Sequence, residues 1–253
     1  MLFNSDLLNI LSLSLLASVL GLTGGTLFLV VKKWSASLTK YSTPFAAGVM
    51  MTVAFLGLLP EASEILGHQA FNIVLATFFV TYIFENFIFD LHHHDHDDHK
   101  HSHSHEEQSV PLVIIGDTIH NFIDGVAIAS AYLINPGLGF VTAVSTLLHE
   151  LPHEIGDFGI LLKAGFSKKK VFLVNLFSSL STVLGSLVVY FFVTGTQLPG
   201  ILMSIAAGMF IYLGASDFLP RANKEVEKTK AVLVLLLGAA LMYLTLSLVP
   251  HAH

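Results

Sequence analysis

The chain has 253 residues, of which 53% are hydrophobic and only 12% charged, and its mean hydropathy is +0.72. Soluble domains carry about 25% charged residues. The composition therefore excludes an ordinary soluble protein and predicts an integral membrane protein whose surroundings are the lipid bilayer. The absence of cysteine excludes disulfides, thiolate metal sites and cysteine nucleophiles. The formal net charge of −6 gives no reason to expect nucleic acid as a partner.

Hydrophobic runs of bilayer-spanning length recur along the chain. A spanning helix needs roughly 20 mostly apolar residues, and turn residues such as Asn135-Pro136-Gly137 separate successive runs. We predict an all-α, polytopic membrane protein with one transmembrane domain over residues 1–253 and eight spans, with seven as the alternative. The spans are expected near Leu7–Val31, Tyr41–Leu59, Ala70–Leu91, Val110–Ile134, Leu138–Leu162, Val171–Val193, Gly200–Leu219 and Ala231–Val249.

The lysine and arginine residues gather in alternate connections between these runs. All 12 of them follow the first, third, fifth or seventh run. Cytoplasmic loops of membrane proteins carry the excess of Lys and Arg, so these connections are predicted to be cytoplasmic and both termini to lie outside. The basic residues are Lys32, Lys33, Lys40, Lys100, Lys163, Lys168, Lys169, Lys170, Arg221, Lys224, Lys228 and Lys230.

A short pattern occurs twice in the chain. Ala46-Ala47-Gly48 precedes Leu59-Pro60-Glu61-Ala62, and Ala206-Ala207-Gly208 precedes Leu219-Pro220-Arg221-Ala222 at the same offset. The two copies fall on spans that run in opposite directions, as in transporters built from inverted repeats. The alternative is that small residues and prolines recur by chance in apolar helices, and the few matching positions do not decide between the two.

Ionisable residues concentrate in the fourth and fifth runs. Residues three and four apart share a helix face, so the fourth run has one polar face, formed by Asp117, His120, Asn121 and Asp124. The fifth run has two adjacent rows, one of His149, His153 and Asp157 and the other of Glu150 and Glu154. Neither set contains a lysine or arginine to balance the acids.

Ionised side chains inside a bilayer cost several kcal/mol each, so these acids need protons, water or bound cations. Carboxylate and neutral imidazole at helical spacing are the ligands that zinc, iron(II) and manganese prefer. The two runs are therefore predicted to bind a divalent transition metal. The alternative is a buried hydrogen-bond network without metal.

Two segments together resemble the paired signatures of the ZIP (Zrt/Irt-like) metal transporters. They are His120-Asn121-Phe122-Ile123-Asp124-Gly125 and His149-Glu150-Leu151-Pro152-His153-Glu154-Ile155-Gly156-Asp157, the second being similar to the HExPHExGD form of one branch. The resemblance extends over the chain in helix count, termini outside and a His-rich loop after the third run. It implies an eight-helix fold with inverted repeats, metal flow toward the cytoplasm and a binuclear centre between the fourth and fifth helices.

Carried over by position, the resemblance implies a first metal site of His120, Asp124, His149 and His153. It implies a second site of Asn121, Asp124, Glu150 and His153, with Asp124 and His153 bridging. With the neighbouring acids of the fifth run, the candidate ligands are His120, Asn121, Asp124, His149, Glu150, His153, Glu154 and Asp157.

The chain departs from the family pattern in two places. Some members carry Glu where Asp124 stands, and some add a carboxylate on the sixth helix. The nearest polar residues of the sixth run here are Asn175, Ser178 and Ser179. We therefore expect the second site to be weaker than the first, or to be filled mainly in transit.

A histidine-rich segment follows the third run. Between residues 92 and 105 it holds eight histidines, a composition that cannot build a core and favours disorder over about 92–109. On the cytoplasmic side it would collect exiting metal or sense it, and the alternative is a solvated linker. Its histidines are His92, His93, His94, His96, His99, His101, His103 and His105.

Other polar residues are candidates for the metal pathway. Glu61 and Glu64 lie at the outer end of the second run, Asp217 near the inner end of the seventh, and Asp117 and Ser178 inside the fourth and sixth. Acids at helix ends are also commonly solvated without any such role.

Two other functions fit part of the pattern. His149-Glu150-x-x-His153 matches the H-E-x-x-H motif of zinc proteases, which would make this an intramembrane zinc metalloprotease. Pro152 inside the motif and the excess of ligands weigh against that reading, because a hydrolytic zinc needs three protein ligands and one open position. A metal sensor that binds without translocating is the other alternative.

Further expectations concern the transported metal, the cofactor, the membrane and the assembly. The sequence does not choose among Zn2+, Fe2+, Mn2+ and Cd2+ as the transported substrate, because all accept histidine and carboxylate. No organic cofactor and no enzymatic activity are expected. We expect a multi-pass protein of the plasma (inner) membrane, with a homodimer as the default assembly of a symmetric membrane protein.

Overall fold

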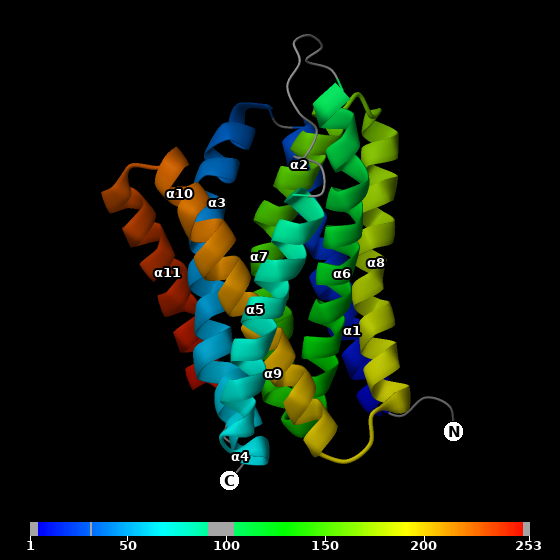
Figure 1. Cartoon of the computed structure of the whole chain (residues 1–253), viewed down its shortest axis with the longest axis vertical. Helices are drawn as coiled ribbons and strands as arrows, with labels where there is room; N and C mark the ends of the chain where they lie inside the picture. The colour runs from blue at the N-terminus through cyan, green and yellow to red at the C-terminus, as the bar shows by residue number, and fades with distance from the viewer. Residues whose placement is uncertain (1–4, 31, 91–103, 250–253) are drawn as a thin grey trace.

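The computed structural model describes residues 5–30, 32–90 and 104–249, and the regular secondary structure within them is helical, without a strand. The helices run mostly along one long axis (Figure 1). In chain order they are α1 (Ser5–Gly21), α2 (Thr23–Val30), α3 (Lys32–Val53), η1 (Ala54–Leu58), α4 (Leu59–Leu66), α5 (Gln69–Asp90), α6 (Ser104–Ile134), α7 (Pro136–Lys163), α8 (Lys168–Phe192), α9 (Gln197–Tyr212), η2 (Leu213–Phe218), α10 (Leu219–Glu225) and α11 (Lys228–Ser247).

The all-α prediction is confirmed. Five helical segments of the described chain have the length and apolarity that crossing a membrane requires, and they coincide with the first, second, sixth, seventh and eighth predicted runs. The third, fourth and fifth runs are also helical, as α5, α6 and α7. The five segments are Ser5–Leu27, Lys40–Leu66, Lys168–Phe192, Gln197–Ala222 and Lys228–Ser247.

Several predicted boundaries were wrong. The first run is interrupted at Leu22, where Gly21 and Gly24 bring the chain against α7; a Cβ on Gly24 would lie 2.6 Å from the Leu151 carbonyl oxygen. The second run continues to Leu66, past its predicted end. The fourth begins at Ser104, so the expected loop at 92–109 ends earlier, and residues 91–103 lie outside the described part.

Two segments of π-helix occupy matching places in the chain. η1 and η2 each interrupt a long helix directly before a Leu-Pro pair, Leu59-Pro60 and Leu219-Pro220. Each proline falls in the first turn of the helix that follows, where a missing N–H costs little. The wider turn therefore lets both helices continue through proline, which is why the second predicted run was too short.

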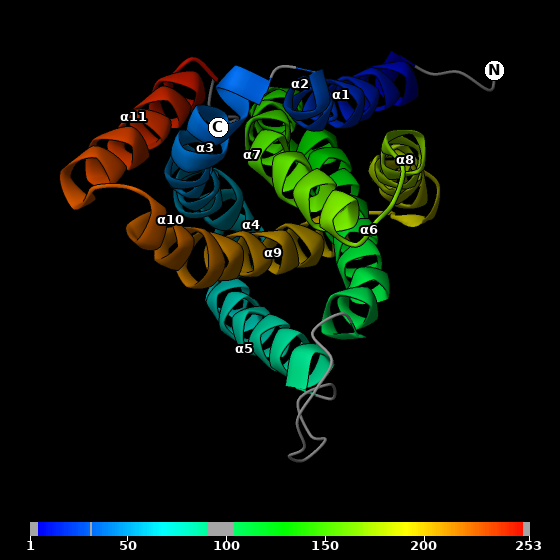
Figure 2. The same ribbon diagram turned by 90° about the horizontal axis from the view of Figure 1, so that it is seen from above.

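Several helix ends that carry basic residues lie at one end of the bundle (Figure 1). Lys163 ends α7 and Lys168 begins α8, while Lys228 begins α11 and Lys32 begins α3. All these ends lie at the top of Figure 1, whereas α1 begins and α11 ends at the bottom. Viewed down the axis, α5, α8 and α11 lie at the periphery and α7 and α9 toward the centre (Figure 2).

Candidate metal centre

The turn between α6 and α7 sets how the two ligand-bearing helices face each other. Asn135 has extended backbone angles and caps α7, with its side-chain oxygen accepting hydrogen bonds from the Gly137 and Leu138 amides at 2.9 and 3.3 Å. Pro136 follows at the first helical position, where its fixed φ suits a helix start. The chain thus reverses in one residue and packs α7 antiparallel along α6.

Four buried side chains from these helices converge. His120 and Asp124 of α6 and His149 and Glu150 of α7 each offer one ligand atom, and these atoms all lie within 4.8 Å of one another. The His149 Nε2 atom is 3.0 Å from Asp124 Oδ2, and His120 Nε2 is 3.3 Å from Glu150 Oε1. The set of two imidazoles and two carboxylates is one that zinc and other divalent transition metals accept.

Further polar atoms at this place are buried without a hydrogen-bond partner among the described residues. They include Asp124 Oδ1, His149 Nδ1, Glu150 Oε2 and His153 Nε2. Leaving such atoms unpaired costs about 1–3 kcal/mol each, and native proteins do so rarely. A bound cation with its water would satisfy several of these atoms at once, so their number fits a site for a charged ligand better than a structural network.

His153 lies beside this cluster rather than inside it. Its ring stacks on His120 with the centroids 4.6 Å apart and an interplanar angle of 25°, and Phe218 of η2 covers it at 5.0 Å. Phe210 of α9 similarly packs against His149 at 5.3 Å. The four-membered group that the structure forms therefore contains Glu150 where the first predicted site has His153.

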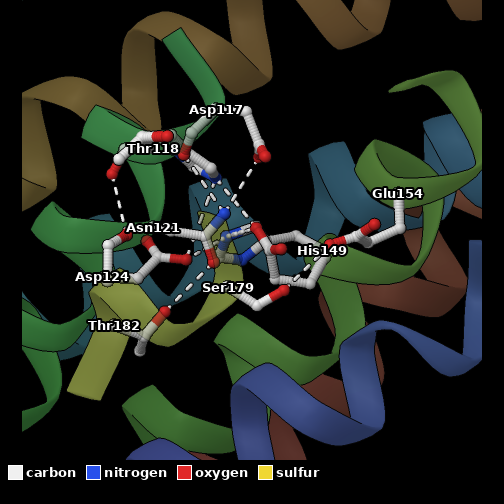
Figure 3. Close-up of polar contacts among 11 residues, drawn as sticks. Asp117, Thr118, Asn121, Asp124, His149, Glu154, Ser179 and Thr182 are labelled. Carbon is white, nitrogen blue, oxygen red and sulfur yellow. Dashed lines mark hydrogen bonds and ion pairs between the residues drawn. The ribbon is translucent and has the colours of Figure 1, made fainter. Parts of the chain in front are cut away.

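Two of the candidate ligands, Asn121 from the predicted second site and the neighbouring acid Glu154, are held by α8 (Figure 3). Asn121 donates to the Asp117 carboxylate at 2.9 Å, and its own carbonyl oxygen accepts from Thr182 at 3.0 Å. Glu154 is buried and accepts from Ser179 at 3.2 Å. These polar contacts fix the side-chain orientations of Asn121 and Glu154.

Asn175, Ser178 and Ser179 were predicted as the nearest polar residues of the sixth run, but the full contribution of α8 was not predicted. Its hydroxyl side chains form a stripe toward α6 and α7: Ser178, Ser179, Ser181, Thr182 and Ser186. The signal was present, because polar residues at spacings of three and four in an otherwise apolar run mark one helix face. Nothing in the sequence indicated Phe210 or Phe218, whose distance from the histidines along the chain hides the contact.

The pathway candidates are spread along the bundle. Glu61 of α4 is half-buried and accepts from the Asn135 amide at 3.4 Å, while Glu64 is exposed. Ser178 shares a hydrogen bond with Thr118 of α6 at 3.1 Å. Asp217 of η2 forms an ion pair with Arg221. The helix that carries Glu61, α4, and the helix that follows Asp217, α10, lie toward opposite ends of the molecule (Figure 1).

The chain matches a known family over nearly its full length. The sequence profile described as ZIP Zinc transporter matches residues 7–112 and 109–246. This chain belongs to the ZIP zinc transporter family. The matched stretches contain α6 and α7 with all four residues of the cluster. The predicted family is therefore confirmed, while the assignment to its HExPHExGD branch stays a prediction.

Similar proteins in this family come from several animals. The chain is 36% identical over 127 residues to zinc transporter foi of Drosophila melanogaster and 35% identical over 131 residues to zinc transporter ZIP4 of Mus musculus. It is 38% identical over 117 residues to metal cation symporter ZIP8 of Rattus norvegicus. These alignments cover 50%, 52% and 46% of this chain but only 18%, 20% and 25% of the relatives.

The geometry departs from that of an H-E-x-x-H protease. Such an enzyme binds zinc with both histidines and keeps the glutamate free to activate water. In this ZIP-family chain Glu150 lies among the ligand atoms with His149, whereas His153 stacks outside the group. The arrangement matches a site of mixed histidine and carboxylate ligands better than a hydrolytic centre.

Proposed function

We propose that this chain carries a divalent transition metal, zinc foremost, across a membrane toward the cytoplasm. The observation that carries the proposal is the buried group of His120, Asp124, His149 and Glu150, with its unpaired polar atoms, inside an apolar helical bundle. Membership of the ZIP family supports it, as do relatives named as zinc transporters. Iron(II), manganese and cadmium are further candidate substrates, because they accept the same ligands.

The proposed transmembrane architecture has eight spans: α1 with α2, α3 through α4, α5, α6, α7, α8, α9 through α10, and α11. The basic helix ends gather at one end of the bundle, which supports a cytoplasmic assignment of that end and places both termini outside. We expect the protein in the plasma membrane, as a homodimer.

An inverted repeat is part of the proposal. The paired π-helical segments before Leu-Pro support it, and so do the two matching glycines of the Ala-Ala-Gly patterns. Gly48 of α3 packs against the Leu235 carbonyl of α11, and Gly208 of α9 packs against the Val74 carbonyl of α5. With the first three and the last three spans as the two repeats, the second helix of each repeat packs through its glycine against the third helix of the other repeat. A twofold relation requires such a paired contact.

We propose a binuclear centre with Asp124 and His153 as bridging ligands. The second metal would use Asn121 and Glu150, while Glu154 and Asp157 supply negative charge close by. Reaching His153 requires its ring to leave the stack on His120, so the second site would form in the course of transport. The acids Glu61 and Glu64 would attract the ion outside, Asp117 and Ser178 would line the path, and Asp217 and the His-rich segment would receive it inside.

Radiolabelled zinc uptake into proteoliposomes tests the proposal. The native chain should show saturable uptake, and Asp124→Ala and His153→Ala should each reduce it at least about 100-fold, since each removes a ligand from a buried site. His68→Ala, which alters an exposed histidine away from the cluster, is the control and should transport normally. Tight zinc binding by the native chain without any flux would contradict transport and favour a sensor.

A further inference from the structure

The segment η2–α10 carries an acid and a base one helical turn apart. Arg221 Nε is 2.7 Å from Asp217 Oδ1, and the two side chains differ sharply in exposure, at 59% for Arg221 and 13% for Asp217. The carboxylate is therefore largely sheltered, whereas the arginine reaches it from the exposed side of the helix. An exposed partner of this kind is readily exchanged, because exposed ion pairs contribute little to stability.

This ion pair lies within electrostatic reach of the metal centre. Phe218, the residue after Asp217, covers the ring of His153. Because Phe218 lies against His153, the ion pair of Asp217 and Arg221 lies next to the part of α7 that carries His153 and Asp157, close enough for its charges to act on them. Arg221 therefore brings a permanent positive charge to a site whose own helices provide only acids and histidines.

The position of Arg221 has a counterpart of opposite charge. In the pattern that occurs twice, Leu59-Pro60 is followed by Glu61, and Leu219-Pro220 by Arg221. Glu61 accepts a hydrogen bond from Asn135 at the turn into α7, at the other end of the bundle from Arg221. The two matching positions thus offer a carboxylate at one end of the bundle and a guanidinium at the other.

We propose that Arg221 is a tethered cation that competes with the metal for Asp217 and thereby drives release at the inner end. This inference rests on the proposed transport function and assigns a role to one residue within it. When no metal is present, the guanidinium neutralises Asp217. A metal that reaches Asp217 displaces the arginine from the carboxylate, and the return of the arginine weakens the hold on the metal. The same charge opposes the binding of cations that approach from the inside.

Zinc binding to the full chain in nanodiscs tests this directly, with uptake as the second measurement. Arg221→Gln should bind zinc at least about fivefold more tightly, in the range typical of coupled sites, and should transport more slowly at saturating zinc. Arg221→Lys retains a positive charge and should stay close to the native chain. Lys228→Gln removes a charge at the same end of the bundle, away from Asp217, and should change neither quantity.

A double-mutant cycle separates competition for Asp217 from a general effect of charge. In the Asp217→Asn background the Arg221→Gln change should have a clearly smaller effect on affinity, because the contested carboxylate is gone. Unchanged zinc affinity in Arg221→Gln would overturn the proposal. So would an equal gain in Lys228→Gln or an undiminished gain in the Asp217→Asn background. If the native chain binds zinc without flux, transport fails while the affinity comparison still decides the role of Arg221.

Discussion

The α6/α8 and α3/α11 interfaces are packed in the same way but differ in function. In each interface, a glycine of either helix lies against a backbone carbonyl of the other helix. Gly125 meets Thr182 while Gly185 meets Phe122, and Gly48 meets Leu235 while Gly238 meets Phe45. Reciprocal glycines let two backbones approach closely, which is how helices associate where lipid removes the hydrophobic driving force.

The two interfaces differ in what surrounds the glycines. Along α8, Ser181 donates to the Thr118 carbonyl at 2.8 Å and Thr182 to the Asn121 side chain at 3.0 Å. The facing stretch of α11, residues 235–239, consists of leucine, glycine and alanine. Close packing alone therefore suffices for a supporting helix pair. Hydroxyl groups are added where a helix must hold metal-binding side chains in one orientation.

The largest expected effect comes from adding a methyl group to one glycine of each interface. Gly125→Ala and Gly48→Ala should each destabilise the fold by about 1–3 kcal/mol or more, because the added Cβ overlaps a backbone carbonyl that cannot move alone. Only Gly125→Ala should also weaken zinc binding, since it displaces α6 next to Asp124. Thermal unfolding in detergent and zinc titration of the folded fraction measure the two effects.

Gly116→Ala is the matched control on α6, because nothing lies within 4 Å of the position its Cβ would take. It should leave both the unfolding temperature and the zinc affinity unchanged. Equal loss of zinc affinity in Gly48→Ala and Gly125→Ala would show that the two interfaces do not divide support and function in this way.

Much of this arrangement could be predicted from the sequence, because it depends on local periodicity. Apolar runs identified the helices, and spacings of three and four placed His120 with Asp124 on one face of α6. The neighbours across the interface could not be found this way. The ring of His153 is held by Phe218, which is 65 positions away in the sequence, so only packing decides that Glu150 joins the cluster instead.

The ends of two helices could not be predicted from the sequence for a related reason. Pro60 and Pro220 favoured helix termination, but the π-helical turns before them absorb the missing hydrogen bond and both helices continue. Such a turn depends on the contacts of the whole bundle and leaves no periodic mark in the chain.

A smaller effect is expected from the hydroxyl groups themselves. Thr182→Val keeps the shape of the side chain but removes the hydrogen bond to Asn121. Supporting contacts of this type typically change metal affinity about 10-fold or more, so zinc binding should weaken by about that factor with little change in the unfolding temperature. Ser204→Ala, which removes a buried hydroxyl bonded within α9 to the Gly200 carbonyl, serves as the control. Equal affinity in the two variants would count against an orienting role for α8.

The smallest effect tests whether the orienting role is confined to the hydroxyls near the ligands. Ser186 lies on the same face of α8, one turn beyond Thr182, and donates to the Gly125 carbonyl at 2.9 Å. Ser186→Ala should cost about 1 kcal/mol of stability, the usual net value of one hydrogen bond. Its zinc affinity should equal that of the native chain, because no candidate ligand side chain is among its hydrogen-bond partners. If Ser186→Ala weakened zinc binding as much as Thr182→Val, the whole α6/α8 interface would act as one rigid support, and the hydroxyl at Thr182 would have no special place in it.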